Sequence, residues 1–376
     1  MSLTNGEMRV IGLMSGSSLD GIDVAQCYFD FGPDPRNDRP LTWAIERAEL
    51  YPYSPEWLER LRAAPTASGR DLWQLHADLG RSYGAVCRHF LDSGSGPLPS
   101  LIASHGHTIH HDPEAGFTIQ IGDGVMIAAA AGLPVVDQLR SADMAAGGQG
   151  APLAPLADEL LFGRYDACLN LGGIANLSLR TPRGYVACDF GAAGQLLDHL
   201  AGQAGMAYDD GGRLAATGRF RADLAKQVDA LPFFRLDYPK SLDNGWVRDH
   251  VIPLYDAVDA PPADKLRTAC VQLAGQLNAH LRRMQVRERM LPDKSTKLMV
   301  AGGGALNDFL LTCIRESSGG GVEPVVIDRK TALYKEAALI ALAGALRLRG
   351  LPNARASATG AERDTVNGAV WAAAGG

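Results

Sequence analysis

Two stretches of this chain share one design, and that repetition limits the fold more than any other feature. Residues 10–23 read VIGLMSGSSLDGID, which is an apolar run, a turn of small residues and the start of a second apolar run. Residues 167–179 read ACLNLGGIANLSL, with the parts in the same order. Each stretch predicts a β-hairpin with a bare tip. The repetition predicts an internal duplication in which each half supplies one anion-binding turn.

The tip of the first hairpin combines small residues with carboxylates. Backbone N–H groups and hydroxyls of small residues can close around a phosphate. Carboxylates just beyond the tip could hold Mg²⁺ through water, and Asp20 and Asp23 are placed for this. A tight turn with solvated carboxylates explains the stretch equally well. The candidate phosphate ligands are Gly16, Ser17, Ser18, Leu19, Asp20, Gly21, Ile22 and Asp23.

Length and composition set broad limits on the class of protein. A chain of 376 residues suggests about two domains, and 46% hydrophobic with 21% charged residues is typical of a soluble globular protein. The net charge of −6 argues against nucleic acid as the main partner. The six cysteines form no CxxC pair, which indicates reduced thiols in a cytoplasmic protein. We expect no signal peptide and no membrane span.

Predicted strands and helices alternate along the chain, which indicates an α/β fold. In the first half the pattern predicts strands at 41–50, 101–104, 117–121 and 134–136 and helices at 55–61, 68–92 and 125–131. Further on it predicts strands at 184–188, 298–301 and 325–327 and helices at 220–231, 264–285 and 333–348. We expect an N-terminal domain over residues 1–138 and a C-terminal domain over residues 139–376.

Four histidines gather after the strand at 101–104, at positions 105, 107, 110 and 111. Their separations do not place them on one helix face. A zinc site would need three or four converging ligands. We therefore interpret this segment as a polar turn beside a binding cleft.

Asp143 is the only carboxylate between Arg140 and Leu156, and it precedes a glycine-rich segment. The segment Gly148–Gln149 within it suggests close approach of the backbone to a ligand. A single carboxylate aimed into a pocket of small residues suits a general base. An N-cap at the start of a helix is an equally good interpretation.

Two further turns carry polar or glycine residues at strand ends. The second hairpin has Gly172 and Gly173 at its tip, flanked by Asn170 and Asn176. Later, a buried strand leads into three glycines and a helix start, which would let an adenosine lie against the backbone near a helix N-terminus. A plain strand-to-helix turn is the alternative. The residues of this adenosine motif are Gly302, Gly303, Gly304 and Asn307. Elsewhere, Asp189 directly follows the predicted strand at 184–188.

The order of these parts resembles the actin, sugar-kinase and heat-shock ATPase superfamily. Within it, the chain resembles the anhydro-N-acetylmuramic acid kinase family over Val10 to about Ala361. The resemblance is carried by GLMSGSSLDGID, SHGHTI, GFTIQIGD, DMAAGGQGAPL, NLGGIANLS, AGGGALN and EAALIALAGALRLRGLPN. It implies two duplicated ribonuclease-H-like domains, the actin-like ATPase fold, around an interdomain ATP cleft. The sequence lacks GxxxxGK[ST], which excludes a P-loop kinase.

The resemblance also implies a reaction. Such kinases cleave the 1,6-anhydro bond of anhydro-N-acetylmuramic acid with water and phosphorylate the freed 6-hydroxyl from ATP. The product is N-acetylmuramate 6-phosphate, an intermediate of cell-wall recycling. By the match of DMAAGGQGAPL, Asp143 would activate the water.

Site residues and partners follow from the same resemblance. The sugar pocket would be lined by His105, Gln120, Arg140, Gly148, Gln149 and Glu336. ATP and Mg²⁺ would be the cofactors, with Asp20 and Asp189 supporting the metal. We expect a cytoplasmic homodimer with no nucleic-acid or membrane partner.

Three single positions and one loop depart from the family pattern. Ser17 stands where the family commonly has Thr, His107 replaces a more usual Gln, and Gln138 replaces a usual Asp. Residues 189–195, DFGAAGQ, differ from the family's Asp-Thr-Gly-Pro-Gly-Asn-like loop, which leaves substrate preference open. Three alternatives stay open: a kinase for another sugar, an ATPase that activates a partner enzyme, and a non-catalytic nucleotide or sugar sensor.

Overall fold

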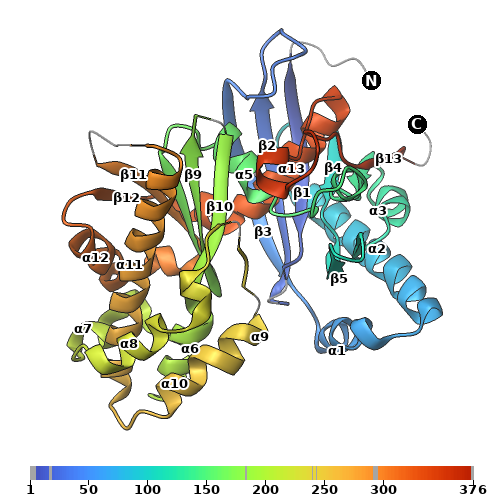
Figure 1. Ribbon diagram of the computed structural model, residues 1–376. Helices are drawn as coiled ribbons and strands as arrows, with labels where there is room; N and C mark the ends of the chain where they lie inside the picture. The colour runs from blue at the N-terminus through green and yellow to red at the C-terminus, as the bar shows by residue number, and fades with distance from the viewer. Residues whose placement is uncertain are drawn as a thin grey trace. The chain divides into compact units, whose positions relative to one another are not determined.

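Two β-sheets with helices packed on them organise the computed structural model, which describes residues 6–16, 19–182, 184–238, 240–242, 244–290 and 295–373 (Figure 1). The chain divides into unit 1, residues 1–161 and 334–376, and unit 2, residues 162–333. The predicted boundary at 138/139 differs from this division, because residues 139–161 and 334–376 lie with the N-terminal sheet. Each unit is described by itself.

Unit 1 contains a six-stranded sheet in the order β13-β7-β4-β1-β2-β3 and a separate two-stranded sheet, β5-β6. Its strands are β1 (Glu7–Met14), β2 (Gly21–Asp30), β3 (Thr42–Pro52), β4 (Leu101–Ser104), β5 (His107–Asp112), β6 (Phe117–Ile121), β7 (Val135–Asp137) and β13 (Ala369–Trp371). Its helices are α1 (Pro55–Ala63), η1 (Ala64–Thr66), α2 (Gly69–Asp92), α3 (Gly124–Ala131), α4 (Ser141–Ala145), α5 (Ala154–Leu160), α14 (Ala356–Thr359) and most of α13 (Arg329–Arg349).

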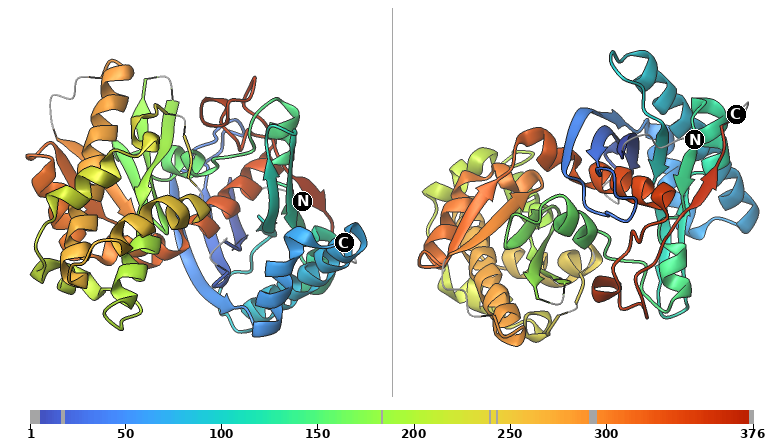
Figure 2. Two further views of the ribbon diagram at one scale, coloured as in Figure 1. Left: turned by 60° about the horizontal axis from the view of Figure 1, so that its bottom comes forward. Right: turned by 90° about the horizontal axis from the view of Figure 1, so that it is seen from above.

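Helices cover the six-stranded sheet of unit 1. Leu79 and Tyr83 of α2 and Ile127 of α3 share one apolar core with Ile11 and Ile102 of the sheet. Helix α13 packs directly on β1 and β4: a Cβ at Gly12 would lie 1.9 Å from the carbonyl oxygen of Ala337, and a Cβ at Gly344 would lie 2.5 Å from Cβ of Ala103. The right-hand view of Figure 2 shows α13 against these strands.

Unit 2 has a five-stranded sheet in the order β10-β9-β8-β11-β12. Its strands are β8 (Ala167–Leu171), β9 (Ile174–Thr181), β10 (Gly184–Ala192), β11 (Thr296–Ala301) and β12 (Val322–Val326). Its helices are α6 (Gly194–Gly202), η2 (Asp210–Gly212), α7 (Arg213–Thr217), α8 (Ala222–Asp229), η3 (Pro232–Arg235), α9 (Asn244–Trp246), η4 (Val247–Val251), α10 (Ile252–Asp256), α11 (Pro262–Arg287), η5 (Gly303–Leu306) and α12 (Asp308–Ser317).

The two main sheets repeat one topology. In unit 1, β1, β2 and β3 form an antiparallel meander, β4 lies parallel beside β1, and β7 lies parallel beside β4. In unit 2, β8, β9 and β10 form the same meander, and β11 and β12 follow in parallel beside β8. This shared strand order, 3-2-1-4-5, confirms the predicted α/β fold with two duplicated ribonuclease-H-like units.

Local signals predicted the helix starts well. Ser54 and Ser68 cap α1 and α2 through their hydroxyls, and Pro55 stands at the first position of α1. The prediction of a turn over residues 107–111 is wrong, because this segment is β5 and pairs with β6. Its polar residues hide the period-2 pattern, so the strand is defined by its partner instead.

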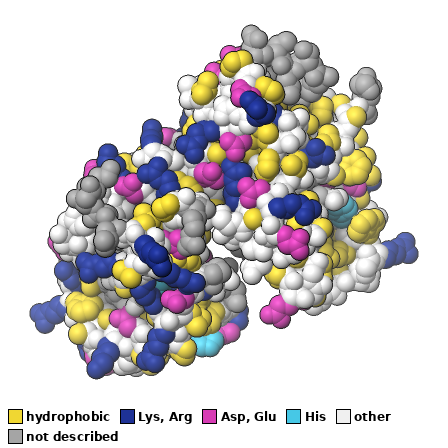
Figure 3. Space-filling model, turned by 45° about the horizontal axis from the view of Figure 1, so that its top comes forward, with side chains coloured by type: hydrophobic (Ala, Val, Ile, Leu, Met, Phe, Trp, Pro, Cys, Tyr) yellow, Lys and Arg dark blue, Asp and Glu magenta, His cyan; other side chains and the backbone are white. Residues whose placement is uncertain are grey.

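The surface mixes both signs of charge. On the face shown in Figure 3, Lys and Arg side chains are interspersed with Asp and Glu side chains. Among the helices of the described residues, none has the length and apolar content required to cross a bilayer.

Candidate functional site

The first predicted phosphate turn is a hairpin tip in unit 1. Met14 of β1 pairs with Asp23 of β2, and the carbonyl of Gly16 accepts the N–H of Leu19 at 3.3 Å. Leu19 has a φ of +61°, a left-handed conformation that is unusual for a side chain of this size. The hairpin prediction is confirmed. Ser17 and Ser18 lie outside the described residues, and phosphate binding stays a prediction.

A chain of buried hydroxyls, not foreseen from the sequence, anchors the start of this turn. The Ser15 hydroxyl lies 2.7 Å from the Tyr53 hydroxyl and 3.0 Å from His107 Nδ1, and Tyr53 lies 3.0 Å from the Tyr83 hydroxyl. Burial lowers the pKa of His107, which favours its neutral form. His107, one of the departures from the family pattern, therefore acts as a hydrogen-bonding support for the tip.

Carboxylates gather behind the same turn. Burial, with the nearby charges of Glu336 and Asp20, raises the pKa of Asp23 to about 6. A cation in the site would relieve this repulsion, so the donor chemistry of Asp20 and Asp23 fits Mg²⁺ held through water. Within the described ranges, no group of three or more His, Cys, Asp or Glu side chains is arranged for direct metal coordination.

Two predicted sugar-binding side chains in unit 1 have nitrogens without partners. His105 is buried; its Nδ1 lies 3.1 Å from the Gly106 carbonyl oxygen, and its Nε2 has no hydrogen-bond partner. Arg140 Nε is also buried and unsatisfied. Burial lowers the pKa of His105 to about 3 and that of Arg140 to about 10, so the imidazole is neutral and the guanidinium charged at pH 7. Such unsatisfied groups suit a polar ligand.

The remaining predicted sugar-binding residues lie at separate places in unit 1. Gln120 on β6 donates to the hydroxyls of Thr108 and Thr118. Gln149 is exposed in the loop after α4, and Glu336 is exposed on α13. The protein atoms around Glu336 nevertheless raise its pKa, while the charges of Lys335 and Arg140 lower it.

Asp143 is fully buried within unit 1, at 0% exposure. Its Oδ1 accepts the hydroxyl of Thr359 at 2.7 Å, and its Oδ2 accepts the N–H of Gly150 at 2.8 Å. A Cβ at Gly148 would lie 2.2 Å from Oδ2, so the backbone of Gly148 covers the carboxylate closely. The N-cap interpretation is wrong, because Arg140 occupies the N-cap position of α4 and Asp143 lies in the first turn of that helix.

In unit 2, the tip of the second hairpin faces a helix start. Leu171 pairs with Ala175 across the tip, which confirms the hairpin and leaves Gly172 and Gly173 as its turn. The carbonyl of Gly172 accepts the N–H of Gly194 at 2.8 Å, and that of Gly173 accepts the N–H of Ala193 at 3.0 Å. Helix α6 thus fixes the turn through its first residues. Phosphate binding by this turn, and by Asn176, stays a prediction.

The three-glycine loop packs against the same hairpin. Gly302 has a φ of +84°, and a Cβ there would lie 2.6 Å from the Leu171 carbonyl oxygen. A Cβ at Gly304 would lie 2.7 Å from Cβ of Leu171. Asn307 accepts the N–H of Leu310 at 2.9 Å and so caps α12. The structure therefore brings together two motifs that lie far apart in the sequence.

Asp189 has a different environment from Asp20. Its Oδ2 accepts the N–H of Leu242 at 2.7 Å, and its own N–H donates to the carbonyl of Lys240. Burial raises its pKa to about 6, although this hydrogen bond and the charge of Lys240 lower it. Because Asp189 lies in unit 2 and holds the segment around residue 240, its geometry indicates a structural role, and metal binding by it stays a prediction.

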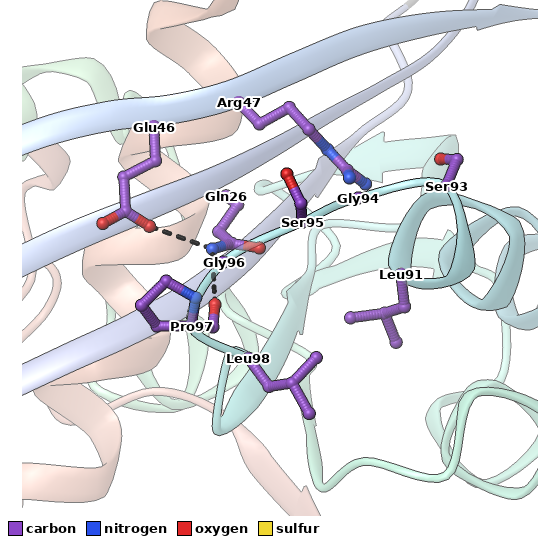
Figure 4. A pocket seen from close by; sticks show the side chains of 10 residues that line it. All are labelled: Gln26, Glu46, Arg47, Leu91, Ser93, Gly94, Ser95, Gly96, Pro97 and Leu98. Carbon is purple, nitrogen blue, oxygen red and sulfur yellow. Dashed lines mark hydrogen bonds between the residues drawn. The ribbon is translucent and has the colours of Figure 1, made fainter.

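A pocket of about 430 Å³ in unit 1 contains none of the predicted site residues (Figure 4). Arg47 lies in it, with its guanidinium 3.5 Å from the centre of the Phe90 ring. Gln26 donates to Glu46 at 2.9 Å and to the carbonyl of Pro97 at 3.1 Å. The pocket is lined by Gln26, Glu46, Arg47, Leu91, Ser93, Gly94, Ser95, Gly96, Pro97 and Leu98.

Comparison with known proteins decides the family. The sequence pattern of anhydro-N-acetylmuramic acid kinases matches residues 8–373, which is nearly the whole chain. This chain belongs to the anhydro-N-acetylmuramic acid kinase family. The enzymes of this family are phosphotransferases with an alcohol acceptor, and the match confirms the resemblance seen in the sequence.

Relatives in the anhydro-N-acetylmuramic acid kinase family match end to end. The kinase from Streptomyces coelicolor is 34% identical over 96% of this chain and 93% of its own length. The one from Rhodospirillum rubrum is 32% identical over 99% of this chain and 96% of its own length.

Among solved structures, this chain is similar to the activator of 2-hydroxyisocaproyl-CoA dehydratase from Clostridium difficile with bound ADPNP. The two share 12% sequence identity at a TM-score of 0.42, and the match covers 90% of this chain and 94% of the activator.

Sequence reasoning missed the partners of Asp143. Thr359 and Asn367 come from the C-terminal segment, which the sequence presents only as small and polar. The N–H of Asp143 donates to Asn367 Oδ1 at 2.9 Å, and the Thr359 hydroxyl donates to its carboxylate. A buried carboxylate needs such partners, but no local pattern identifies which distant residues provide them.

Proposed function

We propose that this chain is an ATP- and Mg²⁺-dependent anhydro-N-acetylmuramic acid kinase. It hydrolyses the 1,6-anhydro bond and phosphorylates the 6-hydroxyl, giving N-acetylmuramate 6-phosphate and ADP for cell-wall recycling. The single observation that carries this proposal is the family match over residues 8–373. The expected homodimer and cytoplasmic location stay predictions.

The proposed reaction balances as one hydrolysis and one transfer. A water oxygen bonds to the anomeric carbon while its proton passes to the carboxylate of Asp143. The bond from that carbon to the 6-oxygen breaks. The 6-oxygen then bonds to the γ-phosphorus of ATP, and the bond between this phosphorus and the oxygen that stays with ADP breaks. Phosphoryl transfer of this kind depends mainly on positioning and on stabilising charge.

The residues of unit 1 support particular roles in this scheme. Neutral His105 and charged Arg140, with their unsatisfied nitrogens, can bind the polar groups of the sugar. The hairpin tip after Met14 would bind the phosphates of ATP. Asp20 and Asp23 would hold Mg²⁺, which neutralises phosphate charge when it is bound.

The burial of Asp143 adds a condition to its role as base. A general base must come within about 3 Å of the proton that it takes, directly or through one water. At 0% exposure the side chain is closed off from solvent. We therefore propose that the loop 146–150 moves away from the carboxylate to admit water when sugar binds. Each carboxylate oxygen keeps a free lone pair for that water.

The mass of the sugar product tests the proposed function. The protein is incubated with the anhydro sugar, ATP and Mg²⁺ in oxygen-18 water, and preformed N-acetylmuramate 6-phosphate in the same water controls for exchange. We expect a 6-phosphate with label at the anomeric hydroxyl. ADP release with glucosamine or xylulose but none with the anhydro sugar would favour a different sugar kinase.

The Asp143→Asn variant tests the base. General-base catalysis typically contributes 10²–10⁴-fold, so we expect kcat to fall by at least about 100-fold. Near wild-type turnover would remove Asp143 from this role while leaving the kinase activity itself intact.

A further inference from the structure

The C-terminal segment of unit 1 is closed on itself by buried side chains. Asn353 and Asn367 are 1% and 0% exposed. The N–H of Asn367 donates to Asn353 Oδ1 at 2.7 Å, and Asn353 Nδ2 donates to the carbonyls of Ala343 and Asn367. Ala354 and Thr365 form an antiparallel bridge inside the loop. These bonds fix residues 353–367 to the last turns of α13.

This closed loop holds Asp143 and the glycine-rich segment at four points. Two are side-chain contacts with Asp143: the Thr359 hydroxyl donates to its Oδ1, and Asn367 Oδ1 accepts its N–H. Two are backbone contacts: the N–H of Gln149 donates to the Thr359 carbonyl, and the N–H of Glu362 donates to the Ala146 carbonyl, each at 3.0 Å. The C-terminal loop 353–367 therefore holds both the carboxylate and the segment that covers it.

We infer that Thr359 is a positioning residue for the reaction, because its hydroxyl sets the orientation of the Asp143 carboxylate. The inference rests on the proposed role of Asp143 as base. A carboxylate can rotate about its Cβ–Cγ bond, and the two oxygens of Asp143 are fixed by different donors. The Gly150 N–H belongs to the loop proposed to move, whereas Thr359 Oγ1 belongs to the anchored C-terminal loop. The proposed movement breaks the backbone bonds of Ala146, Gln149 and Gly150. The Thr359 hydroxyl then keeps the carboxylate in place, because its loop is still held through Asn353.

Two substitutions separate the effect of the Thr359 hydroxyl from the effect of the side chain's shape. Thr359→Val keeps the branched shape and loses the donor, whereas Thr359→Ser keeps the donor and loses a methyl group. Ser357, exposed on the same short helix α14, provides a matched control as Ser357→Ala. We measure kcat and KM for ATP and the anhydro sugar, together with the melting temperature, well below the unfolding range of every variant.

The expected result is a loss in kcat that follows the hydroxyl. Small displacements of a reacting group can reduce rates by about 100-fold, so we expect Thr359→Val to lower kcat by roughly 10- to 100-fold. We expect both KM values within about 3-fold of wild type. Thr359→Ser and Ser357→Ala should keep kcat within about 3-fold.

Three outcomes would overturn the inference. The first is a Thr359→Val protein that is folded and turns over like wild type. The second is a lowered melting temperature with unchanged kcat, which would show a purely structural role. The third is a larger loss in Thr359→Ser than in Thr359→Val, which would assign the effect to packing. If Asp143→Asn itself keeps its turnover, the base assignment fails instead, independently of these variants.

Discussion

Gly302 offers a sharp test of the three-glycine loop. Its φ of +84° is strained for any residue with a side chain, and a Cβ there would lie 2.6 Å from the Leu171 carbonyl oxygen and 3.0 Å from Asn170 Oδ1. The neighbouring Gly303 has no atom within 4 Å of such a Cβ. Alanine should therefore destabilise unit 2 strongly at Gly302 and have almost no effect on its stability at Gly303.

The expected destabilisation by Gly302→Ala follows from two costs. Left-handed backbone in a residue with a Cβ costs about 1–2 kcal/mol, and forcing a methyl group into a packed region costs about 1–3 kcal/mol. Because the contacting atom is backbone, the hairpin β8–β9 must shift to relieve it. We expect the free energy of unfolding of unit 2 to fall by about 2–5 kcal/mol. Gly303→Ala should change it by less than about 0.5 kcal/mol.

Thermal unfolding and nucleotide kinetics together measure the two variants. At about 2–4 °C per kcal/mol for a unit of this size, Gly302→Ala should melt at least about 4 °C lower than wild type. Gly303→Ala should melt like wild type, and a raised KM for ATP in this variant would support adenosine binding at the loop. A Gly302→Ala protein that melts within 1 °C of wild type would refute the reasoning about loop geometry.

Two further predictions concern buried charge in unit 1. Because burial and nearby Glu336 and Asp20 raise the pKa of Asp23 to about 6, the free energy of unfolding falls as pH rises from about 4 to about 6, where the unfolded chain has lost the proton that folded Asp23 keeps. Asp23→Asn should therefore stabilise the protein by about 1–2 kcal/mol above pH 6, after allowance for partial exposure, and have little effect below about pH 4. Melting curves from pH 4 to 8 without Mg²⁺ check this, and a pH-independent difference would contradict it. Lys335 pairs with Asp158 in the interior, at 8% and 2% side-chain exposure. Lys335→Met should lower the free energy of unfolding, measured in guanidinium, by about 3–5 kcal/mol, because it leaves the Asp158 charge buried without its partner. The double variant Lys335→Met/Asp158→Leu should regain most of this loss. A Lys335→Met protein as stable as wild type would argue against the importance of the ion pair.

The sequence alone predicted the parts of this protein that depend on near neighbours. Alternating apolar runs around small-residue turns specified both hairpins, and Ser54 and Ser68 marked helix starts that the structure confirms. The duplication was readable because each copy carries its own local pattern. The family motifs, which are also short and contiguous, identified the same residues as candidate ligands.

The tertiary structure decided what those residues contact. Asp143 is paired with Thr359, 216 positions away, and the Gly302 loop is packed on Leu171. The chain also returns to its first sheet after residue 333, which no composition change announces. Such contacts are set by strand order and by the packing of α13, so short-range periodicity carries no information about them. A polar C-terminal tail becomes the support of a buried carboxylate only once the sheets are assembled.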